Sequence, residues 1–330
     1  MRSLLGGHSK TIVVAAVCIA SSAIACAQEI SFLAGPLASA GEHSYSWQGT
    51  YRSGLGPYAA WSLSWLNEGH ITDHHRDGQT LQAWARLPLL DNRLELSAGA
   101  GPYLYFDTFT GRADRSYANA HGWGLVVSLR AAYYFGNRWI AQMQLNRVNV
   151  NGGPNTTALL FGVGYQLDAP DQPGPRDRPL ARSSSVTGNE LTVMLGASIV
   201  NSDKSESSPA ETLEFRHGLG RHVDVTASLL HEQGRMQSRR YGVAAQVWAT
   251  SAFFGDRFAL SAGVGPYVAV TQSESFPAGR TGDGRVSGLV SISASYKFGD
   301  RWLARVTWNR FATRHDRDAD VIQAGVGVRF

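Results

Sequence analysis

The chain has 330 residues, 43% of them hydrophobic, and a formal net charge of +4. This charge is spread along the chain, so the basic stripe that nucleic-acid binding needs is absent and we expect no nucleic-acid partner. Both cysteines, Cys18 and Cys26, lie in the first 27 residues, which excludes disulfides, thiol catalysis and cysteine metal sites from the remainder.

Residues 1–27 have the pattern of a signal peptide. Arg2 and Lys10 supply a positive region, and the apolar stretch after them ends in the cleavage motif Ala25-Cys26-Ala27. That stretch has about 15 residues, whereas a membrane-spanning helix needs about 20. We therefore expect export and cleavage after Ala27, with acylation of Cys26 as the alternative.

The remainder of the chain consists of two similar copies. Residues 96–103 read Leu-Ser-Ala-Gly-Ala-Gly-Pro-Tyr, and residues 260–267 repeat them with a single change. Residues 135–139, Phe-Gly-Asn-Arg-Trp, return at 298–302 as Phe-Gly-Asp-Arg-Trp. A near-constant offset over this length indicates a tandem duplication.

Turn-forming residues divide the first copy, residues 28–168, into eight segments of about ten residues with alternating side chains, the pattern of β-strands. The predicted strands are 29–38, 44–52, 58–68, 79–89, 94–107, 122–135, 139–149 and 157–167. Tight turns such as 136–138 alternate with longer polar loops such as 69–78 and 109–121. This alternation is typical of a barrel that crosses an outer membrane.

Residues 169–188 have the composition of an extended linker, rich in proline and serine. The second copy follows at 189–330. Its predicted strands are 190–200, 211–218, 223–233, 241–254, 258–271, 286–298, 302–313 and 321–330. Because each copy has a complete set of strands, we predict an all-β protein of two tandem eight-stranded antiparallel transmembrane barrels joined by a periplasmic linker. One fused sixteen-stranded barrel is the alternative.

The last strand shows the alternation clearly. One face carries Ile322, Ala324, Val326, Val328 and Phe330, and the other is polar or small. In a membrane barrel the apolar face meets lipid, whereas in a soluble β-sandwich, the alternative, it points inward. The export signal, the terminal Phe330 and a girdle of interfacial aromatics favour the outer membrane of a Gram-negative envelope. The predicted girdle contains Trp61, Trp65, Tyr103, Tyr133, Tyr134, Trp139 and Trp302.

Polar residues gather on the faces predicted to line the lumens. In the second copy they are Glu214, Arg216, Asp224, Glu232, Gln246, Arg305, Asn309 and Arg329. In the first copy they are Gln48, Thr50, Arg52, Glu68, Gln82, Arg86, Arg130, Gln142, Gln144 and Asn146. Because an eight-stranded barrel is just wide enough for side chains to fill, we interpret these residues as a mutually paired filling; a selective polar pore is the alternative.

Two clusters could in principle hold a metal ion, and for neither do we predict one. His70, Asp73, His74, His75 and Asp77 crowd one predicted loop, but adjacent residues of a flexible loop rarely converge on one ion. The cluster His315, Asp316, Asp318 and Asp320 lacks the glycine and glutamate of a calcium loop. We also expect no cofactor.

The end of each copy resembles the lipid A 3-O-deacylase family of eight-stranded outer-membrane barrels. The resemblance rests on residues 148–155, Val-Asn-Val-Asn-Gly-Gly-Pro-Asn, followed by Gly162-Val163-Gly164-Tyr165. It implies an outer-membrane barrel fold and, in the family, a Ser-His-Glu type site. Aligning Asn151 with the family's asparagine places Val148 at the catalytic histidine and Val150 at the serine.

We therefore expect a non-enzymatic outer-membrane barrel with a structural or envelope-maintenance role, and no catalytic residues. The alternatives are a lipid-A-modifying hydrolase and a passive or polysaccharide-linked pore. The expected partners are outer-membrane lipid, lipopolysaccharide and the barrel-assembly machinery, for which Phe330 is the predicted assembly signal.

Expression of the protein should leave lipid A fully acylated, because a hydroxyl nucleophile and the imidazole that activates it are both missing at the family's positions. The mass spectrum of lipid A from expressing cells is the measurement. Loss of a 3-hydroxyacyl chain would contradict the expectation, provided that a variant without the lumen polar groups left the chain in place.

Overall fold

The computed structural model describes residues 28–71, 73–110, 117–167, 172–175, 187–202, 205–233, 239–272, 285–313 and 318–330, and its regular secondary structure is all β. The predicted signal peptide and most of the linker lie outside the described residues. Within the described ranges, no helix has the length and hydropathy that a membrane span requires.

Eight strands form the first barrel: β1 (Gln28–Ser39), β2 (Glu42–Gly54), β3 (Ala59–Ile71), β4 (His74–Leu89), β5 (Leu94–Phe109), β6 (Ala118–Tyr134), β7 (Trp139–Val150) and β8 (Thr156–Gln166). Eight more form the second: β9 (Glu190–Val200), β10 (Ser207–Gly218), β11 (Val223–Gln233), β12 (Arg239–Phe253), β13 (Phe258–Gln272), β14 (Val286–Phe298), β15 (Trp302–Ala312) and β16 (Ala319–Arg329).

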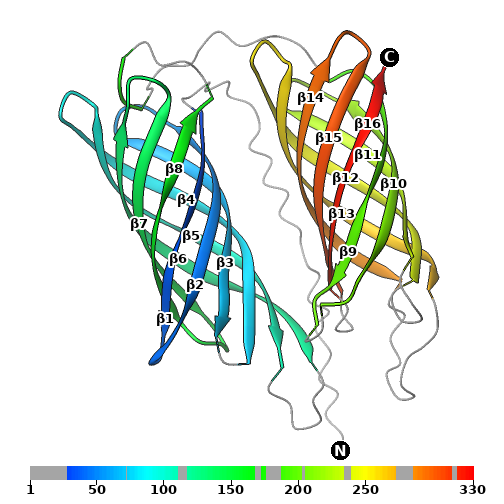
Figure 1. The fold of residues 1–330 in the computed structure, drawn as a ribbon, viewed down its shortest axis with the longest axis horizontal. Helices are drawn as coiled ribbons and strands as arrows, with labels where there is room; N and C mark the ends of the chain where they lie inside the picture. The colour runs from blue at the N-terminus through cyan, green and yellow to red at the C-terminus, as the bar shows by residue number, and fades with distance from the viewer. Residues whose placement is uncertain are drawn as a thin grey trace, which may run out of the picture.

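Each copy closes on itself. Within each copy, every strand pairs antiparallel with the strands next to it in sequence. Pairing of β1 with β8 closes the first barrel, and pairing of β9 with β16 closes the second. The two barrels stand side by side (Figure 1). The prediction of two eight-stranded barrels is therefore confirmed, and the fused sixteen-stranded alternative is wrong.

The two ends of each barrel differ. We call the end with the tight turns, where β16 ends, the turn end, and the opposite one the loop end. All sixteen strands occur where the sequence predicts them, but several reach further toward the loop end. β4 begins at His74, not at residue 79, and β6 begins at Ala118, not at residue 122. The predicted loop 69–78 is therefore wrong, since His70 pairs with His75 and Ile71 with His74 across a β-hairpin.

Side chains alternate between the lumen and the outer surface. On β16, Val321 and Gln323 are buried, whereas Ile322 and Val326 are 48% and 56% exposed. Large apolar side chains are exposed around the outside of both barrels: Phe32, Leu129, Phe161, Val193, Leu195, Val247 and Val306. Each barrel is thus apolar outside and largely polar inside, with an apolar cluster among the lumen side chains, whereas a soluble fold has a polar outside.

A tryptophan inside each lumen accounts for the repeated glycine motif. Trp84 lies directly opposite Gly99, and Trp248 lies opposite Gly263. A Cβ atom on either glycine would overlap the indole, so only glycine leaves room for the ring. Each indole Nε1 donates to a hydroxyl on the neighbouring strand, to Ser62 Oγ at 2.8 Å and to Thr226 Oγ1 at 2.9 Å.

A chain of residues 190–330 behind a signal peptide should fold into a protease-resistant barrel on its own, because β9 and β16 leave no unpaired edge. Heat-modifiable mobility on a gel is the measurement, with residues 28–168 as the matched first copy. An isolated second copy that stays unfolded while the full chain folds would show that closure needs the other barrel.

Candidate functional site

The lumen of the first barrel is crossed near the turn end by a layer of charged side chains. Glu95 lies at its centre and is fully buried. Its Oε1 accepts from Arg52 Nη1 at 2.6 Å and from Arg130 Nη1 at 2.9 Å, and its Oε2 accepts from Arg86 Nε at 2.9 Å. One carboxylate from β5 therefore binds guanidinium groups from β2, β4 and β6.

Glu29 on β1 completes this layer from the other side of the lumen. Its Oε2 accepts from Arg130 Nη2 at 3.3 Å, and its Oε1 accepts from the Tyr134 hydroxyl at 2.8 Å. The Arg52 guanidinium also lies 5.2 Å from the centre of the Trp84 ring. Because strands on opposite sides of the barrel are joined through the lumen, the layer occupies its cross-section.

The second barrel has a corresponding charged layer near its turn end. Arg305 on β15 donates to Glu190 Oε2 at 2.5 Å and to Glu214 Oε1 at 2.6 Å. Arg216 packs 4.2 Å from the centre of the Trp248 ring and pairs with Asp224 at 3.5 Å. Asp224 also accepts from the Thr250 hydroxyl at 2.7 Å.

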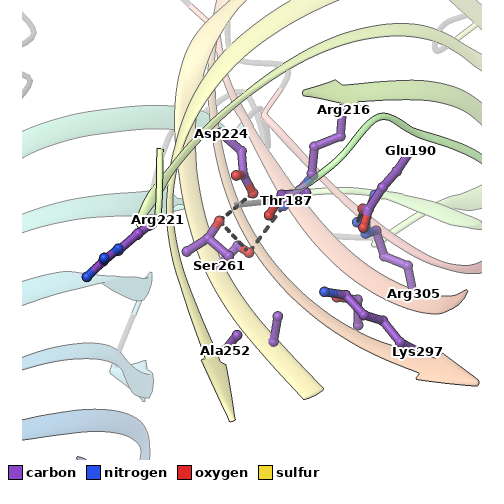
Figure 2. A pocket seen from close by; sticks show the side chains of 12 residues that line it. Thr187, Glu190, Arg216, Arg221, Asp224, Ala252, Ser261, Lys297 and Arg305 are labelled. Atoms are coloured by element: carbon purple, nitrogen blue, oxygen red, sulfur yellow. Dashed lines mark hydrogen bonds and ion pairs between the residues drawn. The ribbon is translucent and has the colours of Figure 1, made fainter. Parts of the chain in front are cut away.

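A small cavity opens at the turn end of this second layer. Figure 2 shows Glu190 and Arg305 side by side on its wall, with Lys297 next to them and Asp224 and Ser261 across the cavity. The lining is rich in charged and hydroxyl groups, and the Arg305–Glu190 ion pair lies in its wall. The cavity therefore borders the charged layer of the second barrel.

Between the charged layer at the turn end and the loop end, uncharged polar groups fill the middle of each lumen. In the first barrel, the Gln48 side-chain oxygen accepts from Asn146 at 2.8 Å and from Gln144 at 3.3 Å. In the second, Gln246 donates to Ser291 at 2.9 Å, and Ser291 donates to Asn309 at 2.5 Å. Amide and hydroxyl groups can satisfy one another there without a charge.

A second charged group lies at the loop end of each lumen. In the first barrel, Arg76 binds Glu68 through two hydrogen bonds of 2.5 and 2.8 Å, and Tyr103 donates to the same carboxylate at 3.0 Å. In the second barrel, Glu232 accepts from Arg240 at 3.1 Å and from Ser198 at 2.7 Å. Each lumen therefore has charged groups near both ends.

The predicted lumen residues of the second copy fall into these three levels and do not form one continuous network. Glu214, Arg216, Asp224, Arg305 and Arg329 belong to the turn end, Gln246 and Asn309 to the middle, and Glu232 to the loop end. Glu29, Glu95 and Glu190 are not among the predicted lumen residues. Strand alternation alone could have identified them, because each of these glutamates falls on the lumen-facing side of its strand.

Three residues of the predicted aromatic girdle do not lie there. Tyr103 and Tyr134 are fully buried inside the first lumen, where their hydroxyls bind Glu68 and Glu29. Trp65 faces outward but is only 5% exposed, because the second barrel covers it. Trp139 and Trp302 do lie on the outer surface, 49% and 51% exposed.

The histidine cluster is also divided by the structure. His74 and His75 are successive residues of β4 and point to opposite faces, with His74 bound to Asp107 at 2.8 Å. Among the residues that the structure describes, no group of three His, Cys, Asp or Glu side chains could hold a metal ion. His315 and Asp316 lie outside the described residues.

Val148, which the resemblance aligns with the deacylase histidine, lies in an apolar cluster at the loop end of the first lumen, with Leu66, Tyr103, Tyr105 and Val126. Val150 packs against this cluster. At the other end of the chain, Phe330 is 71% exposed, and its backbone N–H donates to the Asn189 carbonyl at 3.0 Å.

No protein-family model and no curated protein matches the chain. Among solved structures, the N-terminal β-barrel domain of Pseudomonas aeruginosa OprF is 18% identical; the match covers 42% of this chain and 98% of that one, with a TM-score of 0.34. The monoaromatic hydrocarbon channel CymD is 9% identical over 92% of this chain and 88% of its own, with a TM-score of 0.25. The Acinetobacter baumannii outer membrane protein Omp33 is 8% identical over 94% and 100%, with a TM-score of 0.20.

Replacing Arg305 by alanine should destabilise the second barrel by about 3–5 kcal/mol, because Glu190 and Glu214 would stay buried without their shared partner. Urea unfolding of the protein in lipid vesicles measures the change. Arg329→Ala is the matched control: its side chain is 26% exposed and lies 3.7 Å from Glu190, so a loss below about 1 kcal/mol is expected. Equal losses for both variants would contradict a central role of Arg305.

Proposed function

We propose that this protein is an outer-membrane protein with two sealed barrels and a structural, envelope-maintaining role. The observation that carries the proposal is the charged layer across each lumen, built around Glu95 in one barrel and Arg305 in the other. A lumen that is filled by paired side chains leaves no route for a solute of the kind that a porin admits.

The apolar outer surface supports insertion into a membrane. Leu129, Val193 and Leu195 are 57%, 54% and 62% exposed at the middle of their strands. In water such a surface would aggregate, whereas in a bilayer it is the expected surface of a barrel. The predicted signal peptide is consistent with export.

The surface also indicates the partners that we propose. Trp123, Trp139, Tyr296 and Trp302 are exposed aromatic residues, the type that prefers the boundary between lipid and water. Outer-membrane lipid and lipopolysaccharide would contact this surface. The exposed Phe330 at the end of the chain is the residue that we propose the assembly machinery recognises.

A hydrolase of the deacylase type has no support at the corresponding position. Val148 is 2% exposed among apolar side chains and offers neither a nucleophile nor a base. The buried carboxylate of Glu68 lies at the same end of the lumen, but it is neutralised by the two hydrogen bonds from Arg76. The structural role therefore fits these residues better than ester hydrolysis.

The full-length protein should fractionate with outer membranes, and the purified protein should show heat-modifiable mobility. Because ion pairs cross both lumens, it should give no stable conductance steps in planar bilayers. Single-channel recording measures this. A porin recorded in the same bilayers is the positive control. Recovery of folded protein from the soluble periplasm would contradict the membrane location, and stable steps from the folded chain would favour the pore.

A further inference from the structure

Several outward-facing side chains break the rule that the outer surface of the barrels is apolar and exposed. Trp65 on β3, Asp77 on β4 and Arg310 on β15 all face outward, yet they are only 5%, 7% and 4% exposed. Their own barrels cannot bury them on that side. The cover comes from the other barrel, and these residues belong to a contact between the two.

An arginine of the second barrel lies at the centre of this contact, between a carboxylate of each barrel. Arg310 donates to Asp77 through Nη1 at 2.9 Å and Nη2 at 2.7 Å, which is a bidentate pair between the barrels. Within its own barrel, its Nε donates to Asp320 at 2.6 Å. The guanidinium also lies 5.4 Å from the Trp65 ring and 5.2 Å from the Phe106 ring, so it is enclosed by aromatic groups of the first barrel.

Further hydrogen bonds join the barrels beside this arginine. His121 Nε2 lies 2.5 Å from Asp318 Oδ2. The Asn119 side chain accepts from the Asp318 backbone N–H at 3.2 Å and donates to the Asn201 carbonyl at 3.1 Å. All these residues lie near the loop end. We call the set the docking face: Trp65, Asp77, Phe106, Asn119 and His121 of the first barrel with Asn201, Trp308, Arg310, Asp318 and Asp320 of the second.

The docking face differs between the two copies, although the copies share one ancestor. The positions of Trp65, Asp77 and Phe106 correspond in the second copy to Leu229, Tyr241 and Val270, which are 43%, 40% and 55% exposed. At these positions the second copy therefore has exposed, uncharged side chains, whereas the first copy has buried side chains that include the carboxylate of Asp77.

The half contributed by the second copy is likewise specific to it. Trp308 and Asp320 correspond to Leu145 and Thr157 in the first copy. Arg310 corresponds to Arg147, which is exposed and donates to Thr157 at 2.8 Å. Each half of the docking face therefore occurs in one copy alone, so that a first barrel fits a second barrel and does not fit another first barrel.

We propose that the two barrels of one chain dock laterally through this face and act in the membrane as one rigid pair. Separation would leave Asp77 on the outer surface without Arg310, and Arg310 with Asp320 alone, where lipid and headgroups replace the lost partner poorly. This argument rests on the proposed membrane location but not on the sealed lumens. Docking could therefore fail while both barrels still insert and fold.

Cross-linking in intact outer membranes tests the proposal on the full chain. Cleavage after Ala27 would leave no native cysteine, so a bismaleimide can join Asn119→Cys, whose side chain faces the second barrel, to Ser202→Cys, next to Asn201. A protease site in the linker, between Pro170 and Pro179, is then cut. Cross-linked halves should migrate together on a denaturing gel. Asn119→Cys with Asn189→Cys, which lies at the turn end, is the control pair and should not cross-link.

Charge variants in the Asn119→Cys and Ser202→Cys background test the central ion pair. Arg310→Asp should lower the cross-linked fraction about tenfold or more, because it places three carboxylates together. Adding Asp77→Arg restores a guanidinium between two carboxylates and should restore the cross-link. Arg147→Asp, at the corresponding position of the first copy, should leave the yield unchanged. Heat-modifiable mobility shows for each variant that the barrels are folded.

The outcomes that overturn the proposal are distinct. Folded protein that cross-links no better than the control pair would show that the barrels lie apart. Cross-linked products of two-chain size before the linker is cut would show that the face joins different molecules. A chain that is absent from the outer membrane would contradict the proposed function instead.

Discussion

In each copy the backbone of the last strand is hydrogen-bonded to that of the first, with Glu29 opposite Gln166 in one barrel and Glu190 opposite Arg329 in the other. Closure of this kind leaves no free edge, so the backbone needs no water to satisfy its polar groups. It also fixes which side chains face the lumen, because successive residues of a strand alternate. The apolar outside and the charged inside both follow from it.

Closure around only eight strands makes the lumen a place where charges must find partners. The two copies meet this requirement differently. Arg52 and Arg216 are equivalent and both pack on a tryptophan, but the carboxylate at the centre of the first layer is Glu95, whose counterpart is Ala259. The second layer instead joins Glu214 to Arg305. The two copies thus place their charges on different strands, while each lumen contains paired groups.

The sequence predicts the strands well because alternation and turn residues are local signals. The same alternation assigns each residue of a strand to one of its two faces. Prediction from the sequence fails where polar residues continue a strand beyond the apolar stretch, as at His74 and His75, which look like a loop. It also cannot reveal the docking face, because Asp77 and Arg310 are 233 positions apart and each looks like a solvated charge alone. Only the placement of one barrel beside the other brings them together.

The Trp84–Gly99 pair and its counterpart Trp248–Gly263 limit how the two copies can exchange sequence. A hybrid barrel that takes β4 from one copy and β5 from the other would keep a tryptophan opposite a glycine and would fit sterically. A hybrid with β5 of the second copy would lack Glu95, because Ala259 occupies that position. A hybrid with β4 of the second copy would lack Arg86, which binds Glu95. A hybrid of the two copies would therefore keep the steric fit inside the lumen but lose the pairing of its charges.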